Sequence, residues 1–285
     1  MPHLKPASFA ELRALVDDAL ERALPMSSLP GSEALNGAIH CAIYPGGKRM
    51  RPLFTLLAAQ AAGVPADAAL NAACAVELLH SSSLIFDDLP CMDDADLRRN
   101  RPAIHLIFGE SLALLAGLAL LNQAYFLFAG SARLVQEAAS CIGVNGMIGG
   151  QAADVTGSDL QSRDCKTSAL MRLTLVAGAE AGGAPAAAVA VLGQCGERLG
   201  RAYQMLDDLM DTCTGSGKTM AQDKRHQRTA WSVSPEAILA EVDECCLLLT
   251  GSLGEAARPL AAAVDMVFAR MAEAGGSGIS KSVAA

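Results

Sequence analysis

The sequence is poor in aromatic residues, which make up only 4% of its 285 residues although 52% are hydrophobic. Its interior must therefore consist mainly of Ala, Leu, Val and Met side chains, which allow helices to pack closely. Convincing runs of alternating polar and apolar residues are also lacking, so a sheet-based core is not indicated. Apolar segments of helical length, separated by short Gly/Pro breaks, predict an all-α fold. We expect one domain over residues 1–274 and a disordered tail over residues 275–285.

Paired cysteine motifs are absent. The nine cysteines form no C-x-x-C pair and their number is odd, so neither a zinc site nor a disulfide framework is indicated. Most of them lie in apolar, helix-like contexts, where cysteine is an ordinary small core residue. A reducing compartment suits nine free thiols, and the N-terminus shows no charged-then-apolar signal segment. These features predict a cytoplasmic location.

Positive charge is not in excess. The chain has 22 Lys and Arg residues against 30 Asp and Glu residues, which gives a net charge of −8. A nucleic acid would require a broad basic surface, so we expect no nucleic-acid partner. A small diphosphate needs only a few focused cations, and the overall charge does not argue against such a ligand.

Charged residues are missing from the stretch Ser111–Ala132, which is long enough to cross a membrane. Asn122 and Gln123 lie in its middle, and Gly117 and several alanines lower its hydrophobicity. In a large helical domain, a central helix is apolar all round simply because it is buried. We therefore predict a buried core helix here and no membrane span.

The stretch Glu77–His105 combines clustered acidic and basic side chains. It contains five aspartates and then three arginines: Asp87, Asp88, Asp93, Asp94, Asp96, Arg98, Arg99 and Arg101. A helical pattern before them would place His80 on the same face as the first aspartates. Clustered carboxylates repel one another, and Mg²⁺ relieves that repulsion by binding one or two carboxylates together with phosphates. Nearby arginines can grip a diphosphate bidentately. The alternative is a solvated acidic loop followed by a basic turn.

A second acidic cluster favours the metal-site interpretation. Asp207, Asp208 and Asp211 occur in QMLDDLMD, a helical pattern in which Gln204, Asp208 and Asp211 share a face. Two carboxylate clusters on two helices can hold metal ions between them and bridge those ions to the phosphates of a ligand. Each cluster is followed by basic residues, as a diphosphate site requires.

Further basic residues occur in glycine-containing segments. In GGKRMRP (Gly46–Pro52), Lys48 and Arg51 suit a diphosphate grip better than a loop kept only for solubility. Lys166 precedes a small-residue helix expected over Ser168–Gly183, and taken alone it equally suits an exposed lysine at a helix start. After Asp211, the Gly-Ser-Gly-Lys segment does not match G-x-x-x-x-G-K-[ST], so a lid that carries Lys218 fits better than a phosphate loop.

These motifs together resemble the trans-isoprenyl diphosphate synthases. The shared motifs are D-D-x₄-D, D-D-x-x-D, GGKRMRP, GGQAAD (Gly149–Asp154), Lys166-Thr167 and Gly217-Lys218, in the family's order from about residue 46 to 223. The first aspartate motif, D-D-x-P-C-M-D-D-A, is most similar to that of bacterial carotenoid-type geranylgeranyl diphosphate synthases. The resemblance implies an isoprenoid-synthase-type helical bundle around a central deep apolar cavity.

The resemblance also implies the reaction. Isopentenyl diphosphate would be condensed with an allylic diphosphate (dimethylallyl, geranyl or farnesyl) by ionisation, condensation and elimination. Mg²⁺ would be required, with about three ions in each active site, and relatives act as homodimers. Ser82 and Ser83 stand where farnesyl-making relatives often carry an aromatic floor, which indicates a geranylgeranyl (C20) product. Aromatic residues within 125–128 could supply a floor instead, so a farnesyl or geranyl product stays open.

The resemblance carries the following roles onto this chain. The metal ligands would be Asp87, Asp88, Asp93, Asp207 and Asp211. Isopentenyl diphosphate would be held by Lys48, Arg51, His80 and Arg99. The allylic diphosphate would contact Arg98, Lys166, Thr167 and Lys218, and Gln204 and Arg228 would be further substrate-binding residues. The residues that act in catalysis would be Asp87, Asp88, Asp93, Lys166, Asp207, Asp208 and Lys218.

Two departures from the family pattern keep other functions open. The connection from Gln151 to Lys166 is short, and Arg228 stands near the place where relatives have a second lysine. A non-catalytic regulatory subunit of a heteromeric synthase is therefore an alternative. A terpene cyclase also uses an aspartate-rich helix with Mg²⁺, but its Asn/Ser/Glu triad is absent and it would ignore isopentenyl diphosphate.

Overall fold

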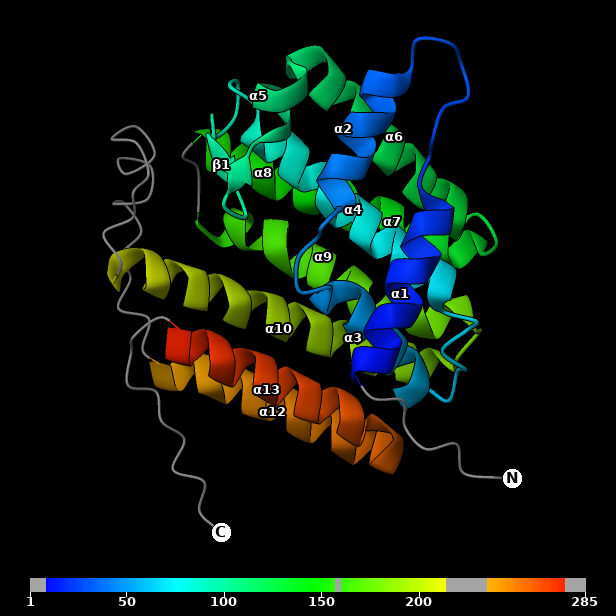
Figure 1. Ribbon diagram of the computed structural model, residues 1–285. Helices are drawn as coiled ribbons and strands as arrows, with labels where there is room; N and C mark the ends of the chain where they lie inside the picture. The colour runs from blue at the N-terminus through cyan, green and yellow to red at the C-terminus, as the bar shows by residue number, and fades with distance from the viewer. Residues whose placement is uncertain (1–8, 157–159, 214–234, 275–285) are drawn as a thin grey trace. The chain divides into compact units, whose positions relative to one another are not determined.

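The computed structural model describes residues 9–156, 160–213 and 235–274 (Figure 1). The helices are α1 (Phe9–Ala23), α2 (Glu33–Ile43), α3 (Met50–Ala61), α4 (Leu70–Asp88), α5 (Ile104–Phe108), α6 (Glu110–Phe128), α7 (Ala132–Ile142), α8 (Met147–Thr156), α9 (Leu160–Ala181), α10 (Ala186–Cys213), α12 (Pro235–Leu253) and α13 (Arg258–Ala274). One antiparallel hairpin joins β1 (Leu97–Arg98) to β2 (Arg101–Pro102). The predicted all-α fold is confirmed, with this hairpin as a small addition.

The contacts of the chain divide it into two compact units. The first comprises Met1–Gln60, Val64–Ala138 and Ala177–Ala184. The second comprises Ala61–Gly63, Ala139–Val176 and Pro185–Ala285. The first aspartate motif and the GGKRMRP segment both belong to the first unit.

Helix α4 is the central element of the first unit. Every side chain from residue 72 to 79 is buried, because α1, α2, α5 and α6 all pack against this helix. The helix ends at Asp88, which is followed by extended backbone at Leu89. The packed core thus carries Asp87 and Asp88 to the end of a helix that neighbouring elements hold in place.

A close contact between α4 and α6 depends on Gly117. A Cβ atom at this position would lie 2.7 Å from the ring of Phe86, so the glycine makes room for that ring. The Ser82 hydroxyl donates a hydrogen bond of 3.0 Å to the Gly117 carbonyl. These contacts fix one face of α4 directly against the backbone of α6.

The prediction that the apolar stretch around α6 is buried all round was wrong. The helix buries mostly small residues on one side (Ala113, Ala116, Gly117, Leu120, Ala124 and Phe128). Four large side chains, here called the outer face of α6, are exposed: Leu114 (45%), Leu115 (48%), Leu118 (46%) and Phe126 (69%). Within the described ranges, α6 is the one helix whose length and composition would suffice to cross a membrane.

In the second unit, α12 packs against both α10 and α13, and the three helices run side by side (Figure 1). Cys195 of α10 and Cys245 of α12 are both fully buried. Each thiol donates to the backbone carbonyl of the other residue, at 3.8 and 3.9 Å. The hydrogen bond with Cys195, together with burial, raises the pKa of Cys245. These cysteines are therefore inert core residues, as expected from their apolar context.

Candidate functional site

Arg49, in the GGKRMRP segment, is a buried anchor and not an exposed cation. Its Nη1 donates to Glu77 Oε1 of α4 at 2.7 Å, and its Nε donates to Asp17 Oδ1 of α1 at 2.9 Å. Its Nη2 donates to the Ile43 carbonyl at the end of α2 at 2.8 Å. Only 2% of Arg49 is exposed, so this residue joins three helices and has no surface to offer a ligand.

The two glycines of the same segment each make room for an arginine. Gly46 has a φ of +80°, and a Cβ atom there would lie 2.4 Å from Nη2 of Arg49. A Cβ atom on Gly47 would lie 2.9 Å from Cζ of Arg99. The Gly-Gly pair therefore lets one guanidinium pass inward and another rest across the backbone.

Arg51 and His80, both predicted to hold isopentenyl diphosphate, lie together in the first unit. Arg51 lies in the first turn of α3, and its Nη1 is 3.3 Å from Nε2 of His80. Because arginine can only donate, Nε2 must accept, which leaves His80 neutral with its proton on Nδ1. Burial lowers the pKa of His80 well below 6.5, and the charges of Arg51, Arg99 and Arg98 lower it further.

Arg99 completes a cationic cluster, defined here as Arg51, His80 and Arg99. It occupies the turn of the hairpin with a φ of +54°, and its guanidinium lies beside Gly47. Burial lowers the pKa of Arg99, and the charges of Arg49 and Arg98 lower it further, while the charges of Glu77 and Asp88 oppose this effect. In the part of the chain that the structure describes, Arg99 has no carboxylate partner. An anion would relieve the repulsion within this cluster.

Asp87 and Asp93 are brought together where the chain folds back on the end of α4. The backbone N–H of Asp93 donates to the Asp87 carbonyl at 2.9 Å, and that of Ala95 donates to the Asp88 carbonyl at 3.3 Å. Asp94 takes a φ of +48°, which helps the chain reverse. The D-D-x₄-D motif thus forms a tight loop, which brings the last aspartate of the motif back to the first.

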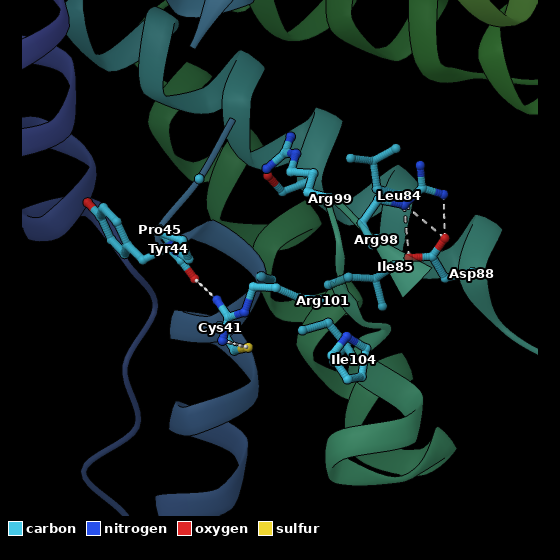
Figure 2. A pocket seen from close by; sticks show the side chains of 14 residues that line it. Cys41, Tyr44, Pro45, Leu84, Ile85, Asp88, Arg98, Arg99, Arg101 and Ile104 are labelled. Carbon is cyan, nitrogen blue, oxygen red and sulfur yellow. Dashed lines mark hydrogen bonds and ion pairs between the residues drawn. The ribbon is translucent and has the colours of Figure 1, made fainter. Parts of the chain in front are cut away.

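Asp88 is paired with a cation. Nε of Arg98 donates to both Asp88 carboxylate oxygens at 3.0 and 3.1 Å, and Nη2 also donates to Oδ1 (Figure 2). Burial acts to lower the pKa of Arg98, but the hydrogen bonds and the charge of Asp88 outweigh it and raise that pKa. This structure therefore gives Asp88 the role of holding Arg98, and its metal-binding role stays a prediction.

The donor set fits Mg²⁺ that is shared with a phosphate ligand. Among the described residues, no three His, Cys, Asp or Glu side chains gather into a metal-binding group. The backbone hydrogen bond from Asp93 to Asp87 brings two acidic residues together at the end of α4. Mg²⁺ is usually held in this way, by one or two carboxylates plus substrate phosphates and not by an all-protein cage.

A pocket adjoins this site on a neighbouring face of α4 (Figure 2). It is lined by Ser81, Leu84 and Ile85 of α4, by the end of α2 and by the hairpin. Across its mouth, Arg101 donates to the Tyr44 carbonyl at 3.2 Å. Asp88, Arg98 and Arg99 belong both to this pocket and to the candidate site, whereas His80 and Asp87 lie on the adjacent stripe of α4.

In the second unit, α8 and α10 approach α9 closely at Lys166 and Ser168. A Cβ atom on Gly150 of α8 would lie 2.4 Å from the Lys166 nitrogen, and one on Gly200 of α10 would lie 2.3 Å from Cα of Ser168. The Thr167 hydroxyl donates to Gln204 Oε1 of α10 at 2.9 Å. Thr167 and Gln204, both predicted to bind substrate, are thus brought together.

The expected start of this helix was wrong. Helix α9 begins at Leu160 and not at Ser168, so Lys166 and Thr167 lie within it and are half-buried. The polar run before Ser168 concealed the helix, because helix formation here depends on packing against α8 and α10 more than on an apolar stripe.

Five predicted site residues have side chains outside the part of the chain that the structure describes. The side chains of Asp207, Asp208 and Asp211 lie outside the described residues, although the backbone there belongs to α10. Lys218 and Arg228 also lie outside them. The roles of these five residues stay predictions.

The remaining predicted residues lie in the first unit. Lys48 is exposed next to Arg49. Ser82 is buried against α6, whereas Ser83 is half-buried on the stripe of His80 and donates to the His80 carbonyl at 2.9 Å.

The sequence analysis missed the anchoring role of Arg49, because three neighbouring cations in one motif look alike without their partners. The signal that could have found it is Glu77, an acidic residue within an otherwise apolar helix, which requires a buried partner. Gln151 is a further candidate, since both polar atoms of its side-chain amide are buried without a partner among the described residues.

The sequence is similar to known proteins over most of its length. The polyprenyl synthetase family matches residues 32–241. The geranylgeranyl diphosphate synthase of Pantoea ananas is 35% identical over 254 residues, which cover 83% of either chain. Geranylgeranyl pyrophosphate synthase 4 of Arabidopsis thaliana is 37% identical, and the match spans 73% of this chain but only 61% of the relative's length.

Solved structures show the same fold. An FPP/GFPP synthase from Zymomonas mobilis has a TM-score of 0.78 and 29% sequence identity, with 91% of this chain and 98% of that chain covered. A geranyltransferase from Legionella pneumophila has a TM-score of 0.74 and 25% identity, with 94% and 96% covered. The chain belongs to the polyprenyl synthetase family.

Proposed function

We propose that the protein is an Mg²⁺-dependent chain-elongating prenyltransferase that condenses isopentenyl diphosphate with an allylic diphosphate to make geranylgeranyl diphosphate. The observation that carries this proposal is the cationic cluster of Arg51, His80 and Arg99 beside the helix end that bears Asp87. A cluster of cations without a carboxylate on Arg99 suits a diphosphate, and the adjacent carboxylates suit a second diphosphate held through Mg²⁺.

Isopentenyl diphosphate would bind at the cationic cluster, with Lys48 as a further cation. Arg51 and Arg99 can each donate two parallel hydrogen bonds to phosphate oxygens. His80 keeps Arg51 in place through its Nε2 lone pair and presents its Nδ1 proton as an additional donor. The neutral imidazole avoids a third positive charge in the empty cluster.

The allylic diphosphate would bind at the aspartate motifs, where Asp87, Asp93 and the second motif would hold Mg²⁺. Mg²⁺ would supply charge neutralisation for the departing diphosphate. Arg98, which Asp88 orients, and Lys166 and Lys218 would add fixed positive charge at the same group. Thr167, Gln204 and Arg228 would complete the contacts that the family resemblance implies.

The reaction breaks one carbon–oxygen bond, forms one carbon–carbon bond and releases one proton. The allylic carbon–oxygen bond breaks, and the diphosphate leaves with the electron pair. The double bond of isopentenyl diphosphate then attacks the allylic cation and forms the new carbon–carbon bond. A proton is lost to the released diphosphate, which needs no protein base. An apolar cavity would keep water away from the cation.

The proposed product length of C20 draws on the names of the relatives and on two serines of α4. The relatives from Pantoea ananas and Arabidopsis thaliana are named as geranylgeranyl diphosphate synthases, whereas the Zymomonas mobilis structure is named as an FPP/GFPP synthase. Ser82 and Ser83 add no bulk before Asp87, which supports a C20 product.

We also propose a homodimer in the cytoplasm. The outer face of α6 supports the dimer, because adjacent exposed Leu and Phe side chains on one helix favour burial against a partner. The free thiols among the described cysteines suit a reducing compartment.

The experiment that tests the function uses the purified protein alone. It is incubated with Mg²⁺, labelled isopentenyl diphosphate and each allylic diphosphate in turn, with Asp87→Ala as control. A C20 product that disappears in the variant supports the proposal. Products that stop at C10 or C15 would correct the proposed product length and leave the proposed reaction intact. A cyclised product made without isopentenyl diphosphate would indicate a terpene cyclase.

A partner-dependent enzyme is the second candidate. One Arabidopsis thaliana relative, 36% identical, is named as the large subunit of a heterodimeric geranylgeranyl pyrophosphate synthase. If no starter is elongated by the protein alone, the stand-alone enzyme is excluded and a heteromeric synthase becomes the better explanation.

A further inference from the structure

Arg49 is a buried cation whose every guanidinium nitrogen is engaged. Nε, Nη1 and Nη2 donate to Asp17, Glu77 and the Ile43 carbonyl, which belong to α1, α4 and the end of α2. Glu77 is itself only 2% exposed. A buried guanidinium is tolerated only when charge and hydrogen bonds compensate its lost hydration, as they do here. Arg49 therefore cannot bind a substrate without leaving all three helices.

The backbone at Arg49 is also constrained. Its φ of +53° lies in the left-handed region, which is unfavourable for a residue with a Cβ atom. The three hydrogen bonds hold it in that conformation. This turn separates Lys48, on the exposed side of the segment, from Arg51 in the first turn of α3.

The same anchor reaches Arg99 through the two glycines. Gly46 leaves the space that the Arg49 guanidinium fills, and the next residue, Gly47, leaves the space beside the Arg99 guanidinium. A shift of the Arg49 side chain would therefore move the backbone under Arg99, as well as Lys48 and Arg51. Three of the four groups proposed for isopentenyl diphosphate depend directly on this segment, and His80 depends on it through Arg51.

We propose that Arg49, held by Glu77 and Asp17, is the positioning residue that sets the geometry of the isopentenyl diphosphate half-site. The inference rests on the proposed function and assigns Arg49 no contact with substrate. Displacing Arg49 should therefore affect the isopentenyl diphosphate half-site and spare the residues proposed for the allylic diphosphate. The cationic cluster loses its geometry when Arg49 is displaced, whereas Arg98 keeps its own partner, Asp88, and Thr167 keeps Gln204.

Two substitutions test the anchor without deleting a large side chain. Arg49→Lys keeps the charge, but a single ammonium cannot reproduce the planar fork that reaches three acceptors. Glu77→Gln keeps the shape of the partner and removes its charge. Asp17→Asn acts at the half-exposed end of the network and keeps the Glu77 contact, so it serves as a milder variant that should fold.

The measurements are the Kd of isopentenyl diphosphate by calorimetry without allylic substrate, KM for each substrate, and the unfolding temperature. We expect isopentenyl diphosphate to bind about tenfold or more weakly in Arg49→Lys and Glu77→Gln, because displacements near 1 Å are costly for positioned groups. The KM for the allylic diphosphate should stay within about twofold. Asp17→Asn should change the same quantities in the same direction, but less.

Leu12→Ala is the matched control for stability. Leu12 is buried in α1 but outside the network, so its truncation should lower the unfolding temperature without changing either KM. The inference is overturned if the folded anchor variants bind isopentenyl diphosphate as tightly as the wild type. It is equally overturned if both KM values rise together, or if Leu12→Ala reproduces the effect. A wild-type protein that does not bind isopentenyl diphosphate would instead remove the proposed function.

Discussion

Nη1 of Arg51 lies 3.3 Å from Nε2 of His80, and this contact fixes both the tautomer and the charge of the histidine. Arginine cannot accept a hydrogen bond, so His80 must be neutral for the contact to exist. The neutral ring lets two arginines lie close together before a diphosphate arrives. The pair therefore links the GGKRMRP segment to α4 and prepares an anion site.

This contact predicts a pH dependence of stability that His80→Gln should reduce. The folded-state pKa of His80 lies well below its ordinary value of 6.5, so the unfolded chain binds a proton that the folded chain does not. His80 therefore contributes nothing above that pH and lowers the free energy of unfolding as the pH falls below it. The extra slope is at most about 1.4 kcal/mol per pH unit.

Chemical denaturation of the wild type and of His80→Gln between about pH 7 and pH 5 measures this slope. We expect the wild type to lose more stability on acidification than the variant. Parallel profiles would contradict the assignment of a buried neutral imidazole.

Gly47→Ala should weaken isopentenyl diphosphate binding without unfolding the protein. Its Cβ atom would collide with the guanidinium of Arg99, the flexible end of a side chain that can move aside. We expect binding to weaken about tenfold, because the displaced cation no longer points at the phosphate. Calorimetry measures the affinity and thermal unfolding measures the stability. Gly130→Ala is the matched control, since nothing lies within 4 Å of its added methyl group, and an equal loss in both variants would argue against the role of Arg99.

Sequence reasoning located the parts of the site that depend on local spacing. His80 and Asp87 fall on one stripe of α4 because helical periodicity requires it. The D-D-x₄-D spacing identified Asp87 and Asp93 as members of one motif, and the structure adds the short loop that returns Asp93 to Asp87. The all-α fold followed from long apolar segments between Gly/Pro breaks, since such segments can bury one another as helices.

The features that escaped prediction depend on partners far away in the chain. Arg49 resembles its neighbours Lys48 and Arg51 until Asp17 and Glu77 are seen to enclose it. The apolar composition of α6 could not show that one side of the helix is exposed in the part of the chain that the structure describes. Lys166 lies within α9 because α8 and α10 approach at glycines, which no pattern near Lys166 reveals.

Ser82 and Ser83 should respond differently to added bulk. Ser82 is buried and donates to the Gly117 carbonyl, so Ser82→Phe would force α4 away from α6 and cost about 1–3 kcal/mol. Ser83 is half-buried on the stripe of His80 and Asp87, so Ser83→Phe should fill space below the aspartates and shorten the product. Product sizing and thermal unfolding separate the two effects. A shortened product from Ser82→Phe with unchanged stability would reverse this assignment.

The outer face of α6 should control the oligomeric state. Leu115→Asp and Phe126→Asp each place a charge among exposed apolar side chains, which a dimer interface would have to bury without a partner. We expect the wild type to have the mass of a dimer in light scattering and the double variant to have that of a monomer. Leu247→Asp, at a position 71% exposed on α12, is the control that should leave the mass unchanged. A wild-type monomer would contradict the proposed dimer.

Asp87 and Asp88 are adjacent but should fail in different ways when neutralised. Asp87 lies beside Asp93 through the backbone hydrogen bond of the returning loop, so Asp87→Asn should remove a metal ligand and raise the Mg²⁺ concentration needed for half-maximal rate. Asp88 holds Arg98, so Asp88→Asn should leave the Mg²⁺ requirement unchanged while the rate at saturating Mg²⁺ falls by about 10²-fold or more. Titrating the elongation rate with Mg²⁺ distinguishes the two, with Asp67→Asn in the exposed segment before α4 as a neutral control. If Asp88→Asn raises the Mg²⁺ requirement as Asp87→Asn does, then Asp88 leaves Arg98 to bind the metal, and the ion pair belongs only to the protein without its substrates.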